Sequence, residues 1–138
     1  MTHLLMDSSA IVALLDKSDE GHRRCVRAMR EVTQPLATCE AVITESCFLL
    51  DRVPGATEAI LANVASRAFQ IRFSLKDSIQ SVQALMYKYR DMPMSLADAC
   101  LIQMADELGT GNILTLDSDF EHYRWRKIKR FNLLIPLV

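Results

Sequence analysis

The 138-residue sequence lacks several features that mark particular classes of protein. Its four cysteines form no Cys-x-x-Cys pair and have no zinc-ligand spacing, which argues against a zinc site and a disulfide-built fold. No apolar run approaches the ~20 residues needed to span a bilayer, and the first residues lack the basic stretch and cleavage site of a signal peptide. These absences predict a protein of the reducing cytoplasm that makes no use of a membrane.

Neither sign of charge is in excess, because 16 basic and 17 acidic residues give a formal net charge of -1. A nucleic acid, if one binds, must therefore be held by a local basic patch rather than by the overall charge. Glycine and proline are scarce, at four each, so their positions are informative about where elements end. Half of the residues are hydrophobic, which is enough for one core, and the length predicts a single domain over residues 1–138.

Short apolar runs alternate along the chain with stretches of helical spacing. Strands that alternate with helices predict an α/β fold, a three-layer sandwich around a central, mostly parallel sheet of about five strands. The first helix is expected to begin with Ser8 or Ser9 as its N-cap. The expected strands are 4–6, 36–38, 69–75, 112–116 and 133–135, and the further expected helices are 18–32, 39–52, 57–67, 76–90 and 95–108.

Four carboxylates stand where one edge of such a sheet would gather them. Asp7 and Asp117 directly follow expected strands, Asp98 lies in the first turn of an expected helix, and Glu45 interrupts an apolar stretch. Ligands bind at the carboxyl ends of parallel strands, and acids that meet there repel one another unless a cation joins them. Oxygen ligands without Cys or His fit Mg²⁺ or Mn²⁺ rather than Zn²⁺, and such ions can catalyse phosphodiester cleavage.

Each acid also has a purely structural interpretation. Ser95 and Asp98 have the spacing of a capping box, Asp117 suits a turn, and Asp7 could cap the helix that follows it. The carboxylate of Glu45 could simply reach solvent past its apolar neighbours. Their joint placement, rather than any one residue, favours a functional site.

Four stretches resemble, in the same order, the motifs of PIN-domain ribonucleases. The resemblance covers nearly the whole chain, and its most specific part is the Thr-x-Asp-x-Asp-Phe sequence near the end of an expected strand. It implies a Mg²⁺- or Mn²⁺-dependent endoribonuclease. Small bacterial members of this family are VapC-type toxins of toxin–antitoxin pairs, which implies an RNA substrate, an antitoxin protein and a homodimer. The four stretches are residues 6–14, 43–45, 95–99 and 114–120.

The resemblance also implies roles for individual side chains. Glu40 competes with Glu45 for the second acid of the motif set, and Glu45 has the better spacing. Ser8 and Thr115 are expected to contact the substrate beside the acids. The implied catalytic acids are Asp7, Glu45, Asp98 and Asp117, and the implied metal ligands are Asp7, Asp98, Asp117 and Asp119.

The densest basic run of the chain is residues 123–131. Arg124, Arg126 and Lys127 could hold RNA phosphates there while a neighbouring aromatic ring stacks on a base. The alternative is a solvated edge whose apolar side chains pack against the domain.

Two other functions fit parts of the pattern. A phosphatase of the haloacid dehalogenase type also uses an aspartate after the first strand, but it needs a second one two residues later, where this chain has Ser9. A non-catalytic RNA- or protein-binding module on the same fold stays open, although the presence of all four acids argues against it.

Overall fold

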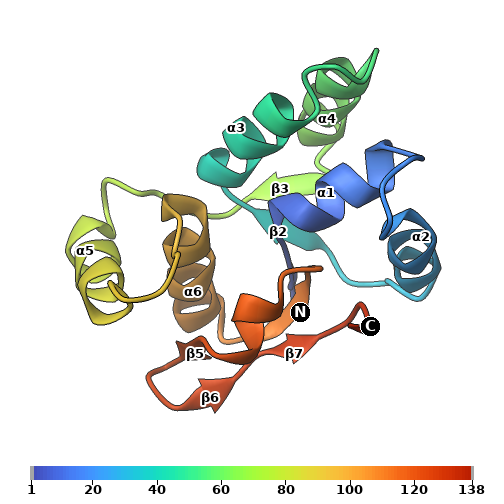
Figure 1. Cartoon of the computed structure of the whole chain (residues 1–138). Coiled ribbons are helices and arrows are strands. Elements are labelled where there is room, and N and C mark those ends of the chain that lie inside the picture. The colour runs from blue at the N-terminus through green and yellow to red at the C-terminus, as the bar shows by residue number, and fades with distance from the viewer. Residues whose placement is uncertain (1, 138) are drawn as a thin grey trace.

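The computed structural model describes residues 2–137, and five parallel strands form its central sheet (Figure 1). The strand order is β3-β2-β1-β4-β7, and every neighbouring pair is parallel. The predicted α/β class and parallel sheet are therefore confirmed. The strands are β1 (Leu4–Met6), β2 (Leu36–Thr38), β3 (Phe69–Ile71), β4 (Asn112–Leu114) and β7 (Asn132–Leu133).

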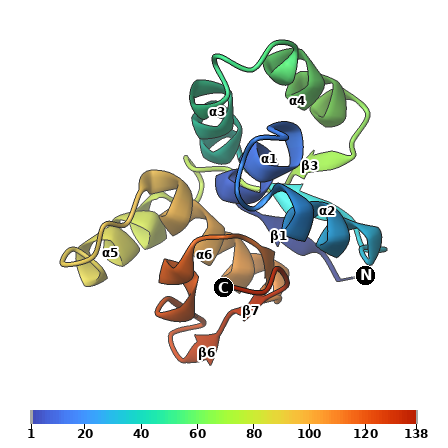
Figure 2. The same cartoon turned by 45° about the vertical axis from the view of Figure 1, so that its right-hand side comes forward.

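Residues 2–137 contain six α-helices on the two sides of the sheet, with α5 packed against α6 (Figures 1 and 2). Because β-α-β connections are right-handed, the helices that lead from β1 to β2 and from β2 to β3 lie on one face, and those that lead back to β4 lie on the other. None of the helices within residues 2–137 is long and apolar enough to cross a membrane. The helices are α1 (Ser8–Leu15), α2 (His22–Arg30), α3 (Glu40–Leu49), α4 (Ala56–Ala65), α5 (Ile79–Lys88) and α6 (Leu96–Leu108).

The core lies around the two central strands, β1 and β4. Leu5, Met6, Ile113 and Leu114 have no exposed surface, as expected for a parallel sheet that is covered on both faces. Full burial of one such side chain stabilises the fold by roughly 1.5–3 kcal/mol. Helix α6 is buried over most of its length and contacts the central strand β1.

The sheet has a switch point between β1 and β4. From β1 the chain continues to β2 on one side, whereas from β4 it continues toward β7 on the other side. Connections that leave two neighbouring strands in opposite directions open a crevice at the strands' carboxyl ends. Asp7 follows β1 at this crevice, and residues 115–117 follow β4.

The beginnings of two helices differ from the predictions. Helix α1 is capped by Asp7, not by Ser8 or Ser9, because the Asp7 carboxylate accepts the Ser8 amide. Helix α2 begins at His22 rather than at residue 18. The segment before α2 forms a turn instead, because the carboxylate of Asp16 accepts the amide of residue 18 and so closes a local loop. The other helices match the predicted ranges to within a turn.

Three predicted strands are wrong in extent, because the strand expected at 112–116 also ends early, at Leu114. The alternating pattern over 69–75 predicts a long strand, but β3 ends at Ile71, which pairs with Thr38 at the end of β2. The only neighbour of β3 among the described strands is β2, which ends at Thr38. The residues beyond Ile71 therefore have no partner strand. The last strand, expected at 133–135, is Asn132–Leu133, since β4 pairs with these two residues.

The basic run contains an antiparallel hairpin that the sequence did not predict. Its strands are β5 (Arg124–Trp125) and β6 (Lys129–Arg130). The turn between them has φ angles of +45° at Arg126 and +70° at Lys127. Such angles usually require Gly, Asn or Asp, so the usual signal for a hairpin turn is missing.

Candidate metal centre and active site

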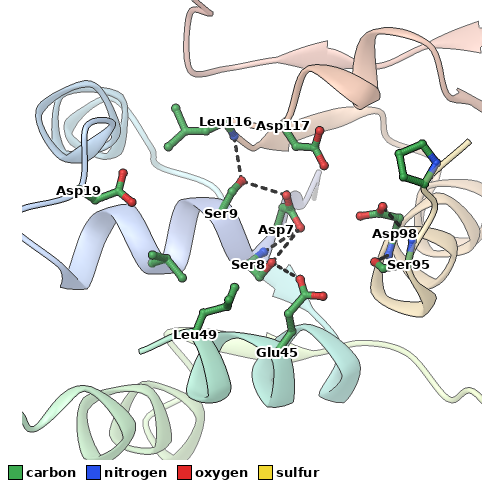
Figure 3. A pocket seen from close by; sticks show the side chains of 12 residues that line it. Asp7, Ser8, Ser9, Asp19, Glu45, Leu49, Ser95, Asp98, Leu116 and Asp117 are labelled. Atoms are coloured by element: carbon green, nitrogen blue, oxygen red, sulfur yellow. Dashed lines mark hydrogen bonds between the residues drawn. The ribbon is translucent and has the colours of Figure 1, made fainter. Parts of the chain in front are cut away.

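A cavity of about 450 Å³ lies at the carboxyl ends of β1 and β4 (Figure 3). The structure brings the four predicted acids together here, each from a different part of the chain. No Lys, Arg or His is among the described residues that line the cavity. Five carboxylates line it: those of Asp7, Asp19, Glu45, Asp98 and Asp117.

Asp7 lies at the centre of the site and is only 3% exposed. Its backbone amide donates to the Leu114 carbonyl at 3.1 Å, which extends the β1–β4 ladder by one residue. Its carboxylate accepts hydrogen bonds from the Ser8 amide (2.8 Å), the Ser9 hydroxyl (2.9 Å) and the Thr115 hydroxyl (2.8 Å). Burial raises the pKa of Asp7 even though these donors favour the charged form.

Hydrogen bonds of the Thr115 and Ser9 hydroxyl groups link the segments that follow β1 and β4. Thr115 donates to Asp7 and accepts from the Asp117 amide at 3.0 Å, and Ser9 accepts from the Leu116 amide at 2.9 Å. Thr115 is fully buried and does not line the cavity. The structure therefore places Thr115 as a positioning residue for two acids, not at the surface where the sequence predicted substrate contact.

Asp117 is the N-cap of a short 3₁₀ helix, η1 (Ser118–Glu121), so its structural interpretation is also correct. Its Oδ1 accepts the Asp119 amide at 2.9 Å. Burial, with the nearby charges of Asp119 and Glu45, raises the pKa of Asp117. Asp119 does not line the cavity, and its assignment as a metal ligand stays a prediction.

Asp98 faces Asp7 from the first turn of α6 (Figure 3). The predicted capping box exists: the Ser95 amide donates to Asp98 Oδ2 at 3.2 Å, and the Asp98 amide donates to the Ser95 hydroxyl at 3.1 Å. The Tyr123 hydroxyl also donates to Oδ2, at 3.3 Å. Burial, together with the charges of the three other predicted acids, raises the pKa of Asp98 to about 7. The capping box thus orients the Asp98 carboxylate, but it brings no positively charged group to it.

Glu45 reaches the cavity from the middle of α3, where its carboxylate accepts a hydrogen bond from the buried Ser8 hydroxyl. Ser8 itself lines the cavity, as its predicted contact with the substrate requires. The competing acid, Glu40, is exposed and lies outside the cavity lining. Glu45 is therefore the acid of this helix that joins the site.

Asp19 is an acid of the cavity that the sequence does not predict. It lies in the turn between α1 and α2, and its Oδ1 accepts the Gly21 amide at 2.8 Å. The sequence places Asp19 in the first turn of the helix expected over 18–32, because Ser-Asp-Glu is a common helix beginning. Only the path of this turn, which returns to the sheet edge, brings Asp19 to the cavity.

The basic side chains of the hairpin do not line the acidic cavity. Arg124 and Lys127 line a second cavity elsewhere on the molecule. The Arg126 guanidinium donates to the Asp106 carbonyl at 3.3 Å, near the end of α6. Direct contact of these residues with a substrate stays a prediction.

The carboxylates surround the cavity without forming a closed set of metal ligands. No group of three or more His, Cys, Asp or Glu side chains within residues 2–137 is already gathered closely enough to hold an ion. The bonds described for Asp98, Asp117 and Glu45 each engage one carboxylate oxygen, and the second oxygen accepts no hydrogen bond from the described part of the chain. The donor set is oxygen alone, which suits a hard cation.

Comparison with known proteins gives the same result for the fold and adds the family. The chain is 27% identical over 116 residues to ribonuclease VapC26 of Mycobacterium tuberculosis, across 83% of this chain and 86% of that protein. The crystal structure of VapC20 from the same organism, a toxin that cleaves the sarcin-ricin loop, superposes with a TM-score of 0.81 at 20% identity, covering 91% of this chain and 98% of that one. The sequence profile of the PIN domain matches residues 4–126. Since this match covers most of the chain and the fold agrees, the chain belongs to the PIN domain family.

Proposed function

We propose that this chain is a divalent-metal-dependent endoribonuclease, with residues 1–138 acting as one nuclease domain. The observation that carries the proposal is the cavity lined by five carboxylates and by no Lys, Arg or His of the described residues. Membership of the PIN domain family and the likeness to a protein named as a ribonuclease support it.

The residues of the site fit a Mg²⁺ or Mn²⁺ ion. Asp7, Asp98 and Asp117 would hold it, and Asp119, which adjoins Asp117 outside the cavity lining, would complete the set. A bound ion would neutralise the carboxylates and supply the Lewis acid that polarises a phosphodiester. Burial is the main cause of the raised pKa values of Asp7, Asp98 and Asp117, and neighbouring carboxylates add to it. A cation bound among these acids would favour their charged forms, which supports the proposal.

The chain's own side chains have distinct tasks in this proposal. Asp7, held by three hydrogen bonds, fixes the centre of the site. Glu45 has an oxygen available to accept the proton of an attacking water. Thr115 and Ser9 keep the ends of the two strands in register, so the acids keep their spacing. Ser8, which donates to Glu45 and lines the cavity, orients this base and meets the substrate.

We also propose that the nuclease is a cytoplasmic, homodimeric toxin of a bacterial toxin–antitoxin pair, inhibited by an antitoxin protein. The likeness to VapC26 and VapC20 supports this role. Expression of the chain alone should arrest growth, and co-expression with a small adjacent reading frame should relieve the arrest. Harmless expression of soluble, active enzyme would count against the toxin role and leave the nuclease activity in place.

The nuclease proposal is tested by incubating the purified protein with mixed RNA and Mg²⁺ or Mn²⁺, with and without a chelator. Asp7→Asn and Asp98→Asn should abolish cleavage, whereas Asp91→Asn, the same change at an exposed acid outside the cavity, should not. Cleavage that survives the chelator, or that survives both cavity substitutions, would refute the proposal.

A further inference from the structure

We propose that a second, basic cavity binds a phosphate group of the RNA strand, a few nucleotides from the bond that is cleaved in the acidic cavity. This proposal rests on the proposed function. The cavity, about 400 Å³, is lined by residues of α5, α6 and the β5–β6 hairpin. Figure 1 shows where these elements lie in the fold. Lys88, Arg124 and Lys127 line it, and Ala84 and Leu85 give it an apolar wall.

The acidic cavity needs such a site. Its five carboxylates repel a phosphodiester, and a cation can attract only the phosphate next to it. The net charge of -1 supplies no general attraction for RNA. Three cationic residues line the second cavity, one each from a helix, a strand and a turn, and the Arg124 guanidinium also donates to the carbonyls of Glu121 and Tyr123. The single carboxylate there, that of Asp106, already accepts a hydrogen bond from the Arg126 amide.

The turn that carries Lys127 is strained. Arg126 and Lys127 both have positive φ angles, which cost non-glycine residues on the order of 1 kcal/mol each. The turn is held in place because the Arg126 amide and guanidinium both bond to Asp106, at the end of α6. Hairpin turns with positive φ angles normally contain Asn or Gly, but this turn contains Arg126 and Lys127. Backbone strain of this kind is often found at ligand-binding sites.

The two cavities are connected by rigid elements. Helix α6 carries Asp98 at the first site and Asp106 at the second, about 12 Å apart along the axis at 1.5 Å per residue. The Tyr123 hydroxyl donates to Asp98, and the amide of the next residue, Arg124, donates to the Tyr89 hydroxyl at 3.1 Å. The rings of Tyr89 and Tyr123 pack edge to face with centroids 5.2 Å apart. The basic groups are therefore held at a fixed distance from the acids, which favours one continuous RNA strand over an acidic peptide as the ligand.

The test compares two double variants that remove the same charge. Lys88→Gln with Lys127→Gln alters the basic cavity, and Arg23→Gln with Arg27→Gln alters exposed residues of α2 that line neither cavity. Both are placed in the Asp98→Asn background, and the binding of a short, labelled single-stranded RNA is measured by fluorescence anisotropy over a range of salt. The lysine variant should weaken binding about tenfold and reduce the salt slope by about 1.4, which is two contacts at about 0.7 each. The arginine variant should change affinity less than about twofold.

The outcomes separate this proposal from the rival ligands and from the proposed function. An equal loss in both double variants would show a general charge effect and overturn it. Unchanged RNA binding, with lost binding of a glutamate-rich peptide, would assign the cavity to a peptide instead. Binding of AMP as tight as that of the RNA strand would assign it to free nucleotides. The unmodified protein, which retains Asp98, is also tested for RNA cleavage. If it cleaves no RNA while the lysine double variant still loses RNA affinity, the nuclease proposal fails and the proposed phosphate site is supported.

Discussion

Replacing Asp98 by Asn should make the metal-free protein more stable. Burial and the neighbouring carboxylates raise the pKa of Asp98 from 3.8 to about 7. An acid whose pKa is higher in the folded state binds its proton more tightly there, so its favourable contribution is present at low pH and is lost as the pH rises from about 4 through 7. The Asn amide carries no charge, and its oxygen can still accept the Ser95 amide of the capping box.

The size of the Asp98 pKa shift determines how much stability the Asp98→Asn substitution can add. A rise from 3.8 to about 7 corresponds to at most about 4 kcal/mol at pH 8. Water in the open cavity screens this penalty, so we expect Asp98→Asn to gain about 1–2 kcal/mol. For a domain of this size that is an increase in Tm of about 4–8 °C. At pH 5 the Asp98 carboxyl of the folded protein is largely protonated, and the gain should fall to about a third.

Thermal unfolding in EDTA at pH 8 and pH 5 measures both values. The control is Asp91→Asn, an exposed acid at which the same change should shift the free energy of unfolding by less than about 0.5 kcal/mol. Millimolar Mn²⁺ should reverse the order, because the ion stabilises the protein with the intact carboxylate more. A gain that is absent at pH 8, or equal at the two pH values, would refute the reasoning.

Three further substitutions test the positions of the side chains. Thr115→Val removes the hydroxyl shared by Asp7 and the Asp117 amide, so kcat in an RNA cleavage assay should fall at least about tenfold and urea unfolding should show a loss of about 1–3 kcal/mol. Phe120→Ala opens a cavity in a fully buried aromatic cluster, and the same urea measurement should show a loss of about 3–5 kcal/mol without a loss of kcat in the protein that remains folded. Gly109→Ala strains the left-handed end of α6, at φ +69°, and should lower the free energy of unfolding by about 1 kcal/mol, measured by thermal denaturation.

Much of the fold could be predicted because its signals are local. Apolar runs predict the strands, and Asp7 stands directly after the first of them in the sequence, with Asp117 a few residues after β4. The capping box of Ser95 and Asp98 is likewise visible in four consecutive residues, and the structure contains it. The extent of β3 was not predictable from its own pattern, because its length depends on the three residues of β2.

The features of the site that were missed depend on the order of the strands. Nothing near Asp19 indicates that the turn after α1 comes back to the crevice between β1 and β4. The motif spacing favours Glu45 over Glu40, but the sequence does not show why: Glu45 lies on the side of α3 that faces Ser8. The hairpin was missed because Arg126 is not a residue that normally accepts a positive φ angle.

The hydrogen bond between Thr115 and Asp7 joins residues 108 positions apart. During synthesis on the ribosome, β1 is therefore made long before its neighbour β4 can pair with it. A nascent chain, or an N-terminal fragment that ends anywhere between these two strands, presents Asp7 at an unfinished sheet edge and lacks Asp117. Such a chain has no assembled acidic pocket, so the structure delays the formation of the site until translation has passed Asp117.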